Sequence, residues 1–426
     1  MYDSRHIIIT AILLLSIASI GGILTKYFKI PYASMLVIIG LFVGIFRIFP
    51  SLKITPYLIY YVFLPVIIFE GAVNIKMRPL ISNILPIGVL SVFGTIISAI
   101  FTGAVFHFVL NFPLKQSLIF GAIITPTDPI SILALLKNRI TKRDIDKKED
   151  IETLLTGESL FNDGISLVLF EVFLGLNLHG AGLNSLSNMF YYVFGIIKTS
   201  TFQFLYESIG GSILGIVLGY LVSLALSLTA DFLTEVMIAL LLAYASLITA
   251  YYLHMSFIMA IIFSGIVLAN YGFKNKVSDR TLEVFPIVIE YLTFIVNSIL
   301  FLIIGIEINL FKIIGIWIMS LFIIILVLFS RFMAVYLISP LVNIIKNRFK
   351  IFSDSLTINK QYKRFLVFGG LKGALPIAMA LSLPLNLHLR NEIITYVFIA
   401  VLFSLTIQAI SFDFFIKKGY KYKNNI

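Results

Sequence analysis

The sequence Gly-Glu-Ser-Leu-Phe-Asn-Asp-Gly at residues 157–164 places two carboxylates, a hydroxyl and an amide in an otherwise apolar segment. Six residues without charge, Ile-Ser-Leu-Val-Leu-Phe, follow at once at positions 165–170. An ionisable group at the centre of a membrane helix costs about 3 kcal/mol on insertion scales, so such groups mark functional sites. If this segment spans a bilayer, Asp163 is the first candidate for the functional residue.

The composition indicates that the segment does span a bilayer. The chain has 426 residues, of which 59% are hydrophobic and 12% charged, and its mean hydropathy is +1.03. Soluble proteins are about 25% charged. No long polar stretch interrupts the apolar ones, so we expect a single membrane domain over residues 1–426 without a soluble domain. The absence of cysteine excludes disulfides, thiolate metal sites and cysteine nucleophiles.

Apolar stretches of about 20 residues, the length of a membrane helix, recur along the whole chain. We therefore predict an all-α integral membrane protein with about thirteen transmembrane helices. The expected spans are residues 7–25, 31–50, 55–73, 84–110, 115–136, 153–176, 201–228, 232–252, 254–271, 285–306, 313–340, 363–384 and 392–415. The shorter apolar stretch at 189–199 is interpreted as interfacial.

The positive charges predict the orientation of these spans. One set of alternate loops holds 23 of the 32 lysines and arginines, and the opposite set holds seven. The positive-inside rule then places the N-terminus outside and the C-terminus in the cytoplasm of a cell membrane. This distribution also accounts for the net charge of +11, so no nucleic-acid partner is needed. The region before the first span is not strongly basic, which favours a retained span over a cleaved signal peptide.

Two of the expected spans contain helix-breaking residues. Span five reads Thr-Pro-Thr-Asp-Pro at 125–129, and span twelve reads Gly-Gly-Leu-Lys-Gly-Ala-Leu-Pro at 369–376. Interrupted helices at membrane depth line cavities or are buried in protein. Because these spans are seven apart, they run in opposite directions. We therefore predict two inverted-topology repeats whose interrupted helices cross at mid-membrane, as in secondary transporters. Asp128 and Lys372 are placed to balance the charges of the half-helix ends.

The polar residues of span six suit the binding of a hard monovalent cation. On a helix, Ser159 and Asp163 lie four residues apart on one face, and Glu158 and Asn162 lie on the adjacent face. Oxygens of Asp163 and Ser159, with carbonyls released at the break around Thr127, can replace the hydration shell of sodium. A poorly solvated carboxylate can also hold a proton. Competition between the two ions, combined with alternating access, is sufficient for exchange.

The remaining charges at membrane depth need partners. We expect Glu158 to form a structural ion pair with Arg331, since a planar guanidinium suits such a pair. Glu70, at the end of span three, is a further candidate ligand. Glu171 lies two turns beyond Asp163 and is a candidate for an outer vestibule. Four other polar residues are interpreted as helix-packing groups: Glu290, Asn297, Ser298 and Gln408.

Three other functions were weighed. An intramembrane aspartyl protease would use Asp128 and Asp163, but the chain has no Gly-x-Gly-Asp sequence. A cation channel is compatible with inverted repeats, although a titratable Asp163 without a carbonyl-filter motif favours coupled exchange. A nucleotide-driven pump would require a phosphate-binding loop, which is absent.

At these positions the chain resembles the monovalent cation/proton antiporters of the NhaP and NHE type. The matching motifs appear in family order and cover most of the chain. They are Phe-Glu-Gly-Ala at 69–72, Thr-Pro-Thr-Asp-Pro at 125–129, Gly-Glu-Ser-Leu-Phe-Asn-Asp-Gly at 157–164, Ser-Arg-Phe-Met-Ala-Val-Tyr at 330–336 and Gly-Gly-Leu-Lys-Gly-Ala at 369–374.

The resemblance implies a sodium/proton antiporter that is not an enzyme and needs no cofactor. Asp163 would bind the proton or the cation, helped by neighbouring groups of the site: Ser159, Thr127, Asp128, Glu70 and Asn162. Direct sodium ligands would come from Asp163, Ser159, Thr127 and Glu70. Potassium/proton antiport by the same fold is the alternative, and lithium is a further candidate ion.

The resemblance also implies an assembly and a mechanism. Family members work as homodimers in which a core moves like an elevator. The core here would comprise spans 3–6 and 10–13, and the other helices would form the dimerisation part. Members with Asn-Asp at positions equivalent to 162–163 are generally electroneutral, which implies one-to-one exchange. Lys372 stands where the family usually has arginine, and lysine can lose its proton when buried.

Overall fold

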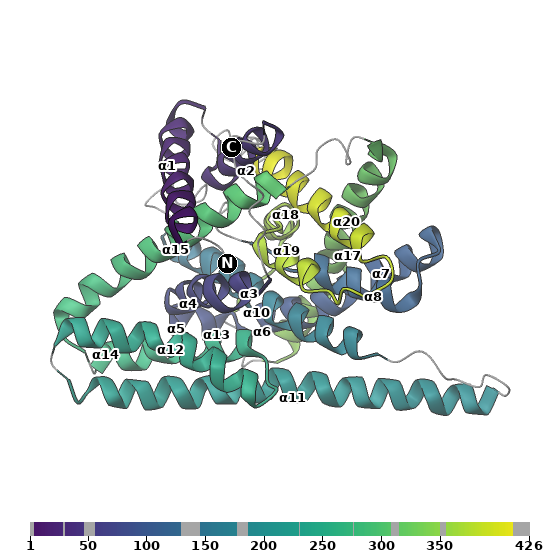
Figure 1. Ribbon diagram of the computed structural model, residues 1–426. Coiled ribbons are helices and arrows are strands. Elements are labelled where there is room, and N and C mark those ends of the chain that lie inside the picture. Colours follow the sequence, from purple (N-terminus) through teal and green to yellow (C-terminus); the bar gives the residue numbers. More distant parts are fainter. Residues whose placement is uncertain are drawn as a thin grey trace, which may run out of the picture.

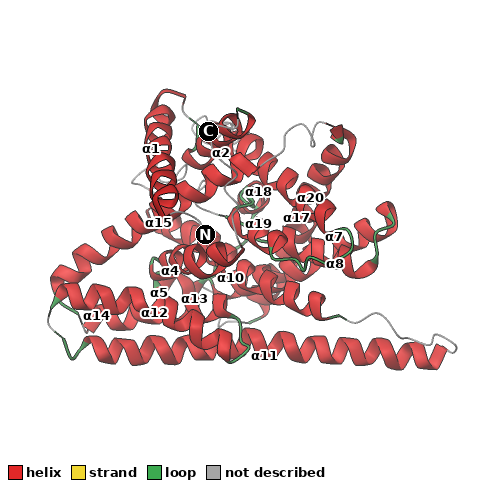
Figure 2. Cartoon of the chain, in the orientation of Figure 1, coloured by secondary structure: helices red, strands yellow, loops and turns green. Residues whose placement is uncertain are grey.

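The described elements of the computed structural model are all helices (Figures 1 and 2). The structure describes residues 4–28, 30–46, 56–128, 145–176, 186–229, 231–275, 277–307, 315–349 and 355–411. Their α-helices are α1 (Ser4–Phe28), α2 (Tyr32–Ile45), α3 (Pro56–Leu58), α4 (Leu64–Val73), α5 (Met77–Ser82), α6 (Ile84–Val89), α7 (Thr95–Leu110), α8 (Leu114–Ile124), α10 (Ile145–Gly175), α11 (Leu186–Leu226), α12 (Phe232–Tyr252), α13 (Phe257–Val267), α14 (Phe273–Asn275), α15 (Asp279–Glu307), α17 (Trp317–Arg348), α18 (Lys360–Phe368), α19 (Ala374–Leu381) and α20 (Arg390–Phe403).

The membrane character of the helices is confirmed, but not their expected number. Among the described residues, six helical stretches are long and apolar enough to cross a membrane, or seven if the bent pair α1 and α2 counts as one. Helices occupy the other expected ranges too, but these are shorter or carry several charges. The count of about thirteen spans, and the inverted repeats, remain predictions.

Several helices extend beyond the ranges expected from hydropathy. The apolar stretch at 189–199, for which an interfacial position is predicted, is part of the uninterrupted helix α11. Helix α10 begins at Ile145 and α15 at Asp279, each several residues before its expected span. Hydropathy marks the part of a helix that contacts lipid, whereas backbone hydrogen bonding continues into the polar flanks.

Helix α11 lies along one edge of the molecule with α12 beside it (Figure 1). It packs closely on α13 because three glycines form the contact. An added Cβ would lie 2.4 Å from the Ser256 carbonyl oxygen at Gly211, 2.3 Å from the Ala260 carbonyl oxygen at Gly215 and 2.8 Å from the Ser264 carbonyl oxygen at Gly219. Small residues allow helix backbones to approach in this way in membranes. The outward side of α11 carries exposed isoleucines and tyrosines, as a lipid-facing surface requires.

The two predicted interruptions are confirmed, and they touch. Helix α8 ends at Ile124, and residues 125–128 are not helical. Helices α18 and α19 are separated by the non-helical residues 369–373. The Asp128 amide donates to the Leu371 carbonyl oxygen at 2.8 Å, which joins one break to the other. The rest of span five, residues 129–136, and the following residues up to 144 lie outside the described residues.

Candidate ion-binding site

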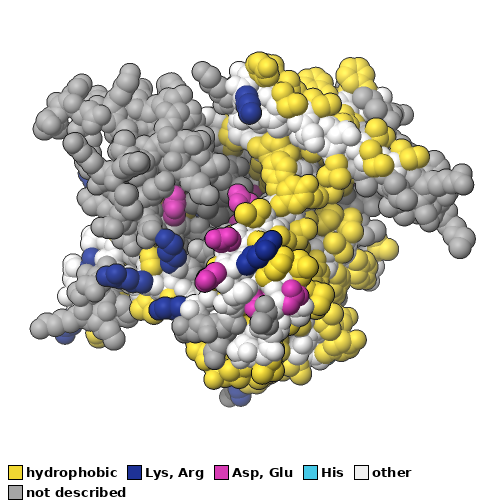
Figure 3. Space-filling view, turned by 90° about the vertical axis from the view of Figure 1, so that its left-hand side faces the viewer, with side chains coloured by type: hydrophobic (Ala, Val, Ile, Leu, Met, Phe, Trp, Pro, Cys, Tyr) yellow, Lys and Arg dark blue, Asp and Glu magenta, His cyan; other side chains and the backbone are white. Residues whose placement is uncertain are grey.

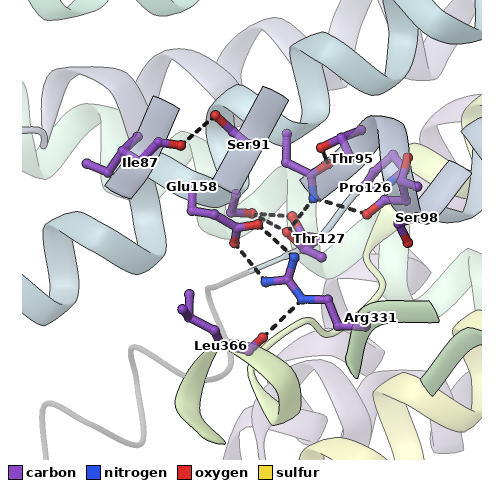
Figure 4. Close-up of polar contacts among 12 residues, drawn as sticks. Ile87, Ser91, Thr95, Ser98, Pro126, Thr127, Glu158, Arg331 and Leu366 are labelled. Carbon is purple, nitrogen blue, oxygen red and sulfur yellow. Dashed lines mark hydrogen bonds and ion pairs between the residues drawn. The ribbon is translucent and has the colours of Figure 1, made fainter. Parts of the chain in front are cut away.

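Helix α10 presents the two carboxylates of the motif to different neighbours. Glu158 is 3% exposed and faces Arg331 of helix α17. Arg331 donates from both terminal nitrogens, at 2.7 Å to Glu158 Oε1 and 2.9 Å to Oε2 (Figure 4). Its Nε donates to the Leu366 carbonyl oxygen of α18 at 3.0 Å. The pair therefore joins three helices through a planar, two-pronged contact.

Gly370 makes room for this pair. A Cβ at this position would lie 2.8 Å from Arg331 Nε. The glycines of span twelve therefore interrupt the helix and also admit the guanidinium beside the break.

Asp163 faces the other interruption. The Thr127 amide donates to Asp163 Oδ1 at 3.2 Å, because the missing helical turn leaves this N–H without a carbonyl partner in α8. Ser159, one turn earlier on α10, donates to the Thr127 carbonyl oxygen. Thr127 Oγ1 in turn donates to Ser159 Oγ at 3.2 Å. The extended backbone at Thr127 thus holds the oxygens of Ser159 and Asp163 in one place.

Asn162 holds the same segment from the adjacent face of α10. Its Nδ2 donates to the Thr125 carbonyl oxygen at 3.0 Å and to Thr127 Oγ1 at 3.1 Å. Its Oδ1 accepts from Thr95 of α7 at 2.6 Å and from Ser166 at 3.2 Å. Asn162 is 1% exposed, so all its polar atoms are used within the protein. The Asn162 side chain therefore holds residues 125–127 against α10 without adding a charge.

Lys372 lies at the C-terminal end of α8. Its Nζ donates to the carbonyl oxygens of Thr125 at 3.1 Å and Pro126 at 3.2 Å. A cation here compensates the negative end of the helix dipole and the carbonyls released by the break. On the other half-helix, a Cβ at Gly373 would lie 2.8 Å from Asp128 Cβ, so Asp128 adjoins the N-terminus of α19. The structure thus places a lysine at the C-terminal end of α8 and an aspartate beside the N-terminus of α19.

A cavity of about 100 Å³ lies beside these groups. Its polar lining comes from the two breaks and from α4, α10 and α15: Glu70, Thr127, Asp128, Thr156, Ser159, Asp163 and Asn297. A second cavity of about 320 Å³ shares Glu70, Gly71 and Thr156 with the first and extends past Glu152 and Glu290. Acidic and basic side chains gather on one face of the molecule next to a broad hydrophobic surface (Figure 3).

The structure brings most of the predicted site residues together. One cavity is lined by five of them: Asp163, Ser159, Thr127, Asp128 and Glu70. Asn162 is not among the lining residues, but it donates a hydrogen bond to Thr127 Oγ1. The Glu70 carboxylate accepts from Asn74 Nδ2 at 2.5 Å.

The sequence did not identify two polar residues that line the cavity, Thr156 and Asn297. Thr156, Ser159, Leu160 and Asp163 follow the i, i+3, i+4, i+7 spacing of one helix face, and this spacing would have identified Thr156. Asn297 had been interpreted as a packing group, as had Ser298, which does pack against Tyr32 through a 2.8 Å hydrogen bond.

Comparison with known families decides what kind of protein carries this site. The transmembrane sodium/hydrogen exchanger family matches residues 12–418. The chain belongs to this family. The exchanger is 31% identical over 95% of its length to the Na(+)/H(+) antiporter ApNhaP of Aphanothece halophytica, and covers 72% of that relative. It is 30% identical to the Na(+)/H(+) antiporter NhaH of Halobacillus dabanensis, with 98% of this chain and 99% of the relative covered.

A solved structure shows the same fold. The sodium proton antiporter MjNhaP1 of Methanocaldococcus jannaschii at pH 8 matches this exchanger with a TM-score of 0.67. The alignment covers 96% of this chain and 100% of the other, at 20% sequence identity. The interrupted helices and buried polar groups described above thus lie in a fold shared with a known antiporter.

Proposed function

We propose that this sodium/proton antiporter exchanges its ions at Asp163, which binds either a cation or a proton. The observation that carries the proposal is the placement of Asp163. Its carboxylate lines the cavity between the two interrupted helices and accepts from the Thr127 amide. Glu158, the other acid of the motif, is already neutralised by a two-pronged contact with Arg331. Asp163 is therefore the acid of the motif to which transported ions have access.

Oxygen atoms around Asp163 suit a hard monovalent cation. Ser159 and Thr127 present hydroxyl oxygens next to the carboxylate, and Glu70 lines the same cavity. The Thr125 and Pro126 carbonyls are directed at Lys372, so they contribute less to the site than the sequence suggested. We propose that the cation is coordinated by Asp163, Ser159, Thr127 and Glu70, with water completing the shell, and that Asp128 shapes the site from the end of the first break, where it contacts the second.

Access to the site supports alternating exchange. The cavity at Asp163 shares lining residues with the larger one near Glu290, and by the loop charges this is the cytoplasmic side. We propose that the core of spans 3–6 and 10–13 moves against the remaining helices to expose the same site outside. In this proposal the protein is a homodimer in the cell membrane, with its N-terminus outside and its C-terminus inside.

The charges favour one-to-one exchange. Asn162 supplies an amide where a second acid would add a proton-binding group, and all its polar atoms are hydrogen-bonded. Lys372 holds carbonyl oxygens rather than a carboxylate. One carboxylate that alternates between a sodium ion and a proton moves one positive charge each way, so the cycle is electroneutral.

The experiment is exchange by the purified protein in proteoliposomes that contain a pH-sensitive dye. Sodium, lithium and potassium are added in turn, with the membrane potential clamped at zero or at a negative value. We expect sodium to drive proton movement at a rate that does not depend on the potential. Potassium-selective exchange would favour the alternative antiporter. Sodium flux that persists without proton movement would indicate a channel and contradict the proposal.

A further inference from the structure

A third cavity, of about 870 Å³, lies at the other end of α10 from the cavity of about 320 Å³ near Glu290 (the inner cavity). It is lined by the ends of several helices, with Tyr60 from the segment before α4, Glu171 from α10, Gln203 and Glu207 from α11 and Arg390 from α20. None of its lining residues also lines the cavity at Asp163. Glu171 follows Asp163 by eight residues, which corresponds to about 12 Å along a helix. This is therefore a separate site.

Two carboxyl groups meet in this cavity. The Glu171 carboxyl group lies against that of Glu207. Glu207 is 6% exposed, and Gln203 Nε2 donates to its Oε1 at 2.8 Å. Its Oε2 is buried and has no hydrogen-bond donor within the described residues. Two adjacent carboxylates repel each other, and a buried carboxylate oxygen without a partner is costly. The arrangement therefore requires a positive charge near Oε2, which either a proton shared by the two carboxyl groups or a bound cation supplies.

The nearby cationic side chain does not satisfy this requirement. Arg390 directs Nε to the Leu383 carbonyl oxygen at 2.9 Å and its Nη2 to the Leu381 carbonyl oxygen at 3.0 Å. These two bonds hold its guanidinium at the C-terminal end of α19. Glu171, in contrast, is exposed in the cavity, so an ion from solution reaches the pair.

We infer that Glu171 and Glu207 form a second binding site, which takes a monovalent cation on the side of the membrane opposite the inner cavity. The donors are all oxygens: the two carboxylates, the Gln203 amide oxygen and the hydroxyl of Tyr60, which lies 3.4 Å from the Ser382 hydroxyl. Such a set suits a hard cation. The inference rests on the proposed function only for the identity of the cation, which would bind here before it reaches Asp163.

The test measures cation binding in a variant that cannot exchange. The thermal midpoint of Asp163→Asn is measured in detergent with sodium chloride and with choline chloride at the same ionic strength. We expect sodium to raise the midpoint, and we expect the added change Glu207→Gln to abolish this rise. Glu392→Gln removes an exposed carboxylate at the start of α20 and is the matched control, which should keep the rise.

Three results would overturn the inference. They are no sodium-dependent rise in Asp163→Asn, a rise that survives Glu207→Gln, and a rise produced by calcium or magnesium but not by sodium. If Glu207→Gln does not fold, Glu171→Gln gives the same test from the exposed side of the pair. Because binding is read without transport, a failure here is distinguishable from a failure of the Asp163 assignment, which would appear as exchange by Asp163→Asn.

In the protein with Asp163 intact, Glu207→Gln should affect sodium supplied from one side of the membrane only. We expect Glu207→Gln to raise the sodium KM several-fold when sodium is supplied on the outer side, with little change in kcat or in the inner KM. Equal changes on both sides would indicate a structural effect and would overturn the inference.

Discussion

Glu158 and Asp163 lie five residues apart on the same helix, yet their surroundings give them opposite uses. Glu158 contacts a guanidinium through both of its oxygens and is 3% exposed. Asp163 lines a cavity and accepts from a backbone amide at 3.2 Å. A charged group at membrane depth thus stabilises the protein when its partner is another side chain, and takes part in transport when its partner is an ion from solution.

The largest effect should follow from Asp163→Asn. The asparagine amide has nearly the same shape as the aspartate carboxylate, but it carries no charge. It therefore cannot exchange a bound proton for a sodium ion. We therefore expect sodium-driven proton movement in proteoliposomes to fall to the level of empty vesicles, while the purified variant elutes and melts like the parent protein. Full dequenching of the pH dye by this variant would show that another residue carries the ions.

Breaking the ion pair should chiefly affect stability. Removing one partner of a buried pair leaves an uncompensated charge and typically costs about 3 kcal/mol. We expect Arg331→Ala to melt at a markedly lower temperature in detergent. The folded fraction should retain exchange after correction for its amount.

Glu158→Gln together with Arg331→Met is the matched control, because it removes both charges at once and should recover part of the lost stability. A normal melting temperature combined with lost exchange in Arg331→Ala would instead make Arg331 a transport residue and erase the contrast with Asp163.

A smaller effect is expected at Asn162. Asn162→Ala leaves the Thr95 hydroxyl without its acceptor, which costs about 1 kcal/mol, and leaves the Thr125 carbonyl with Lys372 as its remaining donor. Thr127 would be held less firmly, so the sodium KM should rise while exchange continues. Ser166→Ala removes one donor to Asn162 and the contact with the Thr125 hydroxyl, but leaves the bonds from Asn162 to Thr125 and Thr127 in place and should change KM less. An unchanged KM in Asn162→Ala would show that the amide does not position the site.

The smallest effect is expected for Lys372→Arg. An arginine also donates several hydrogen bonds, so it can hold the Thr125 and Pro126 carbonyls if the role of Lys372 is to balance the end of α8. Exchange rates and their pH dependence should therefore change little, and Lys372→Met should be far more harmful. A large displacement of the pH profile in Lys372→Arg would show that the lysine itself releases a proton during the cycle.

Short sequence motifs predicted the parts of the site that depend on the residue types at neighbouring positions. Prolines around Thr127 and glycines around Lys372 predicted both interruptions, since these residues cannot sustain a regular helix. The need of a membrane arginine for a partner predicted the contact of Arg331 with Glu158. The positions of Thr95 and Asn297 could not be predicted, because they reach the site only through packing of α7 and α15 against segments distant in sequence.

The ends of the helices were also only partly predictable from the sequence. Hydropathy located the apolar centre of α11 but not its continuation back to Leu186, because the backbone hydrogen bonds of a helix do not end where its hydrophobic surface ends. The short donor distances from Asn162 to Thr125 and Thr127 likewise depend on how two helices pack, and the sequence alone left Asn162 among the ion-binding candidates.

Competition between sodium and a proton at Asp163 is the central claim, and proton release on sodium binding tests it most directly. Sodium is added to the detergent-solubilised protein in weakly buffered solution, and bound sodium and released protons are measured together. We predict that the parent protein releases one proton for each sodium ion bound at Asp163, and that Asp163→Asn lacks this release. Sodium-dependent proton release by Asp163→Asn, equal to that of the parent protein, would contradict the account.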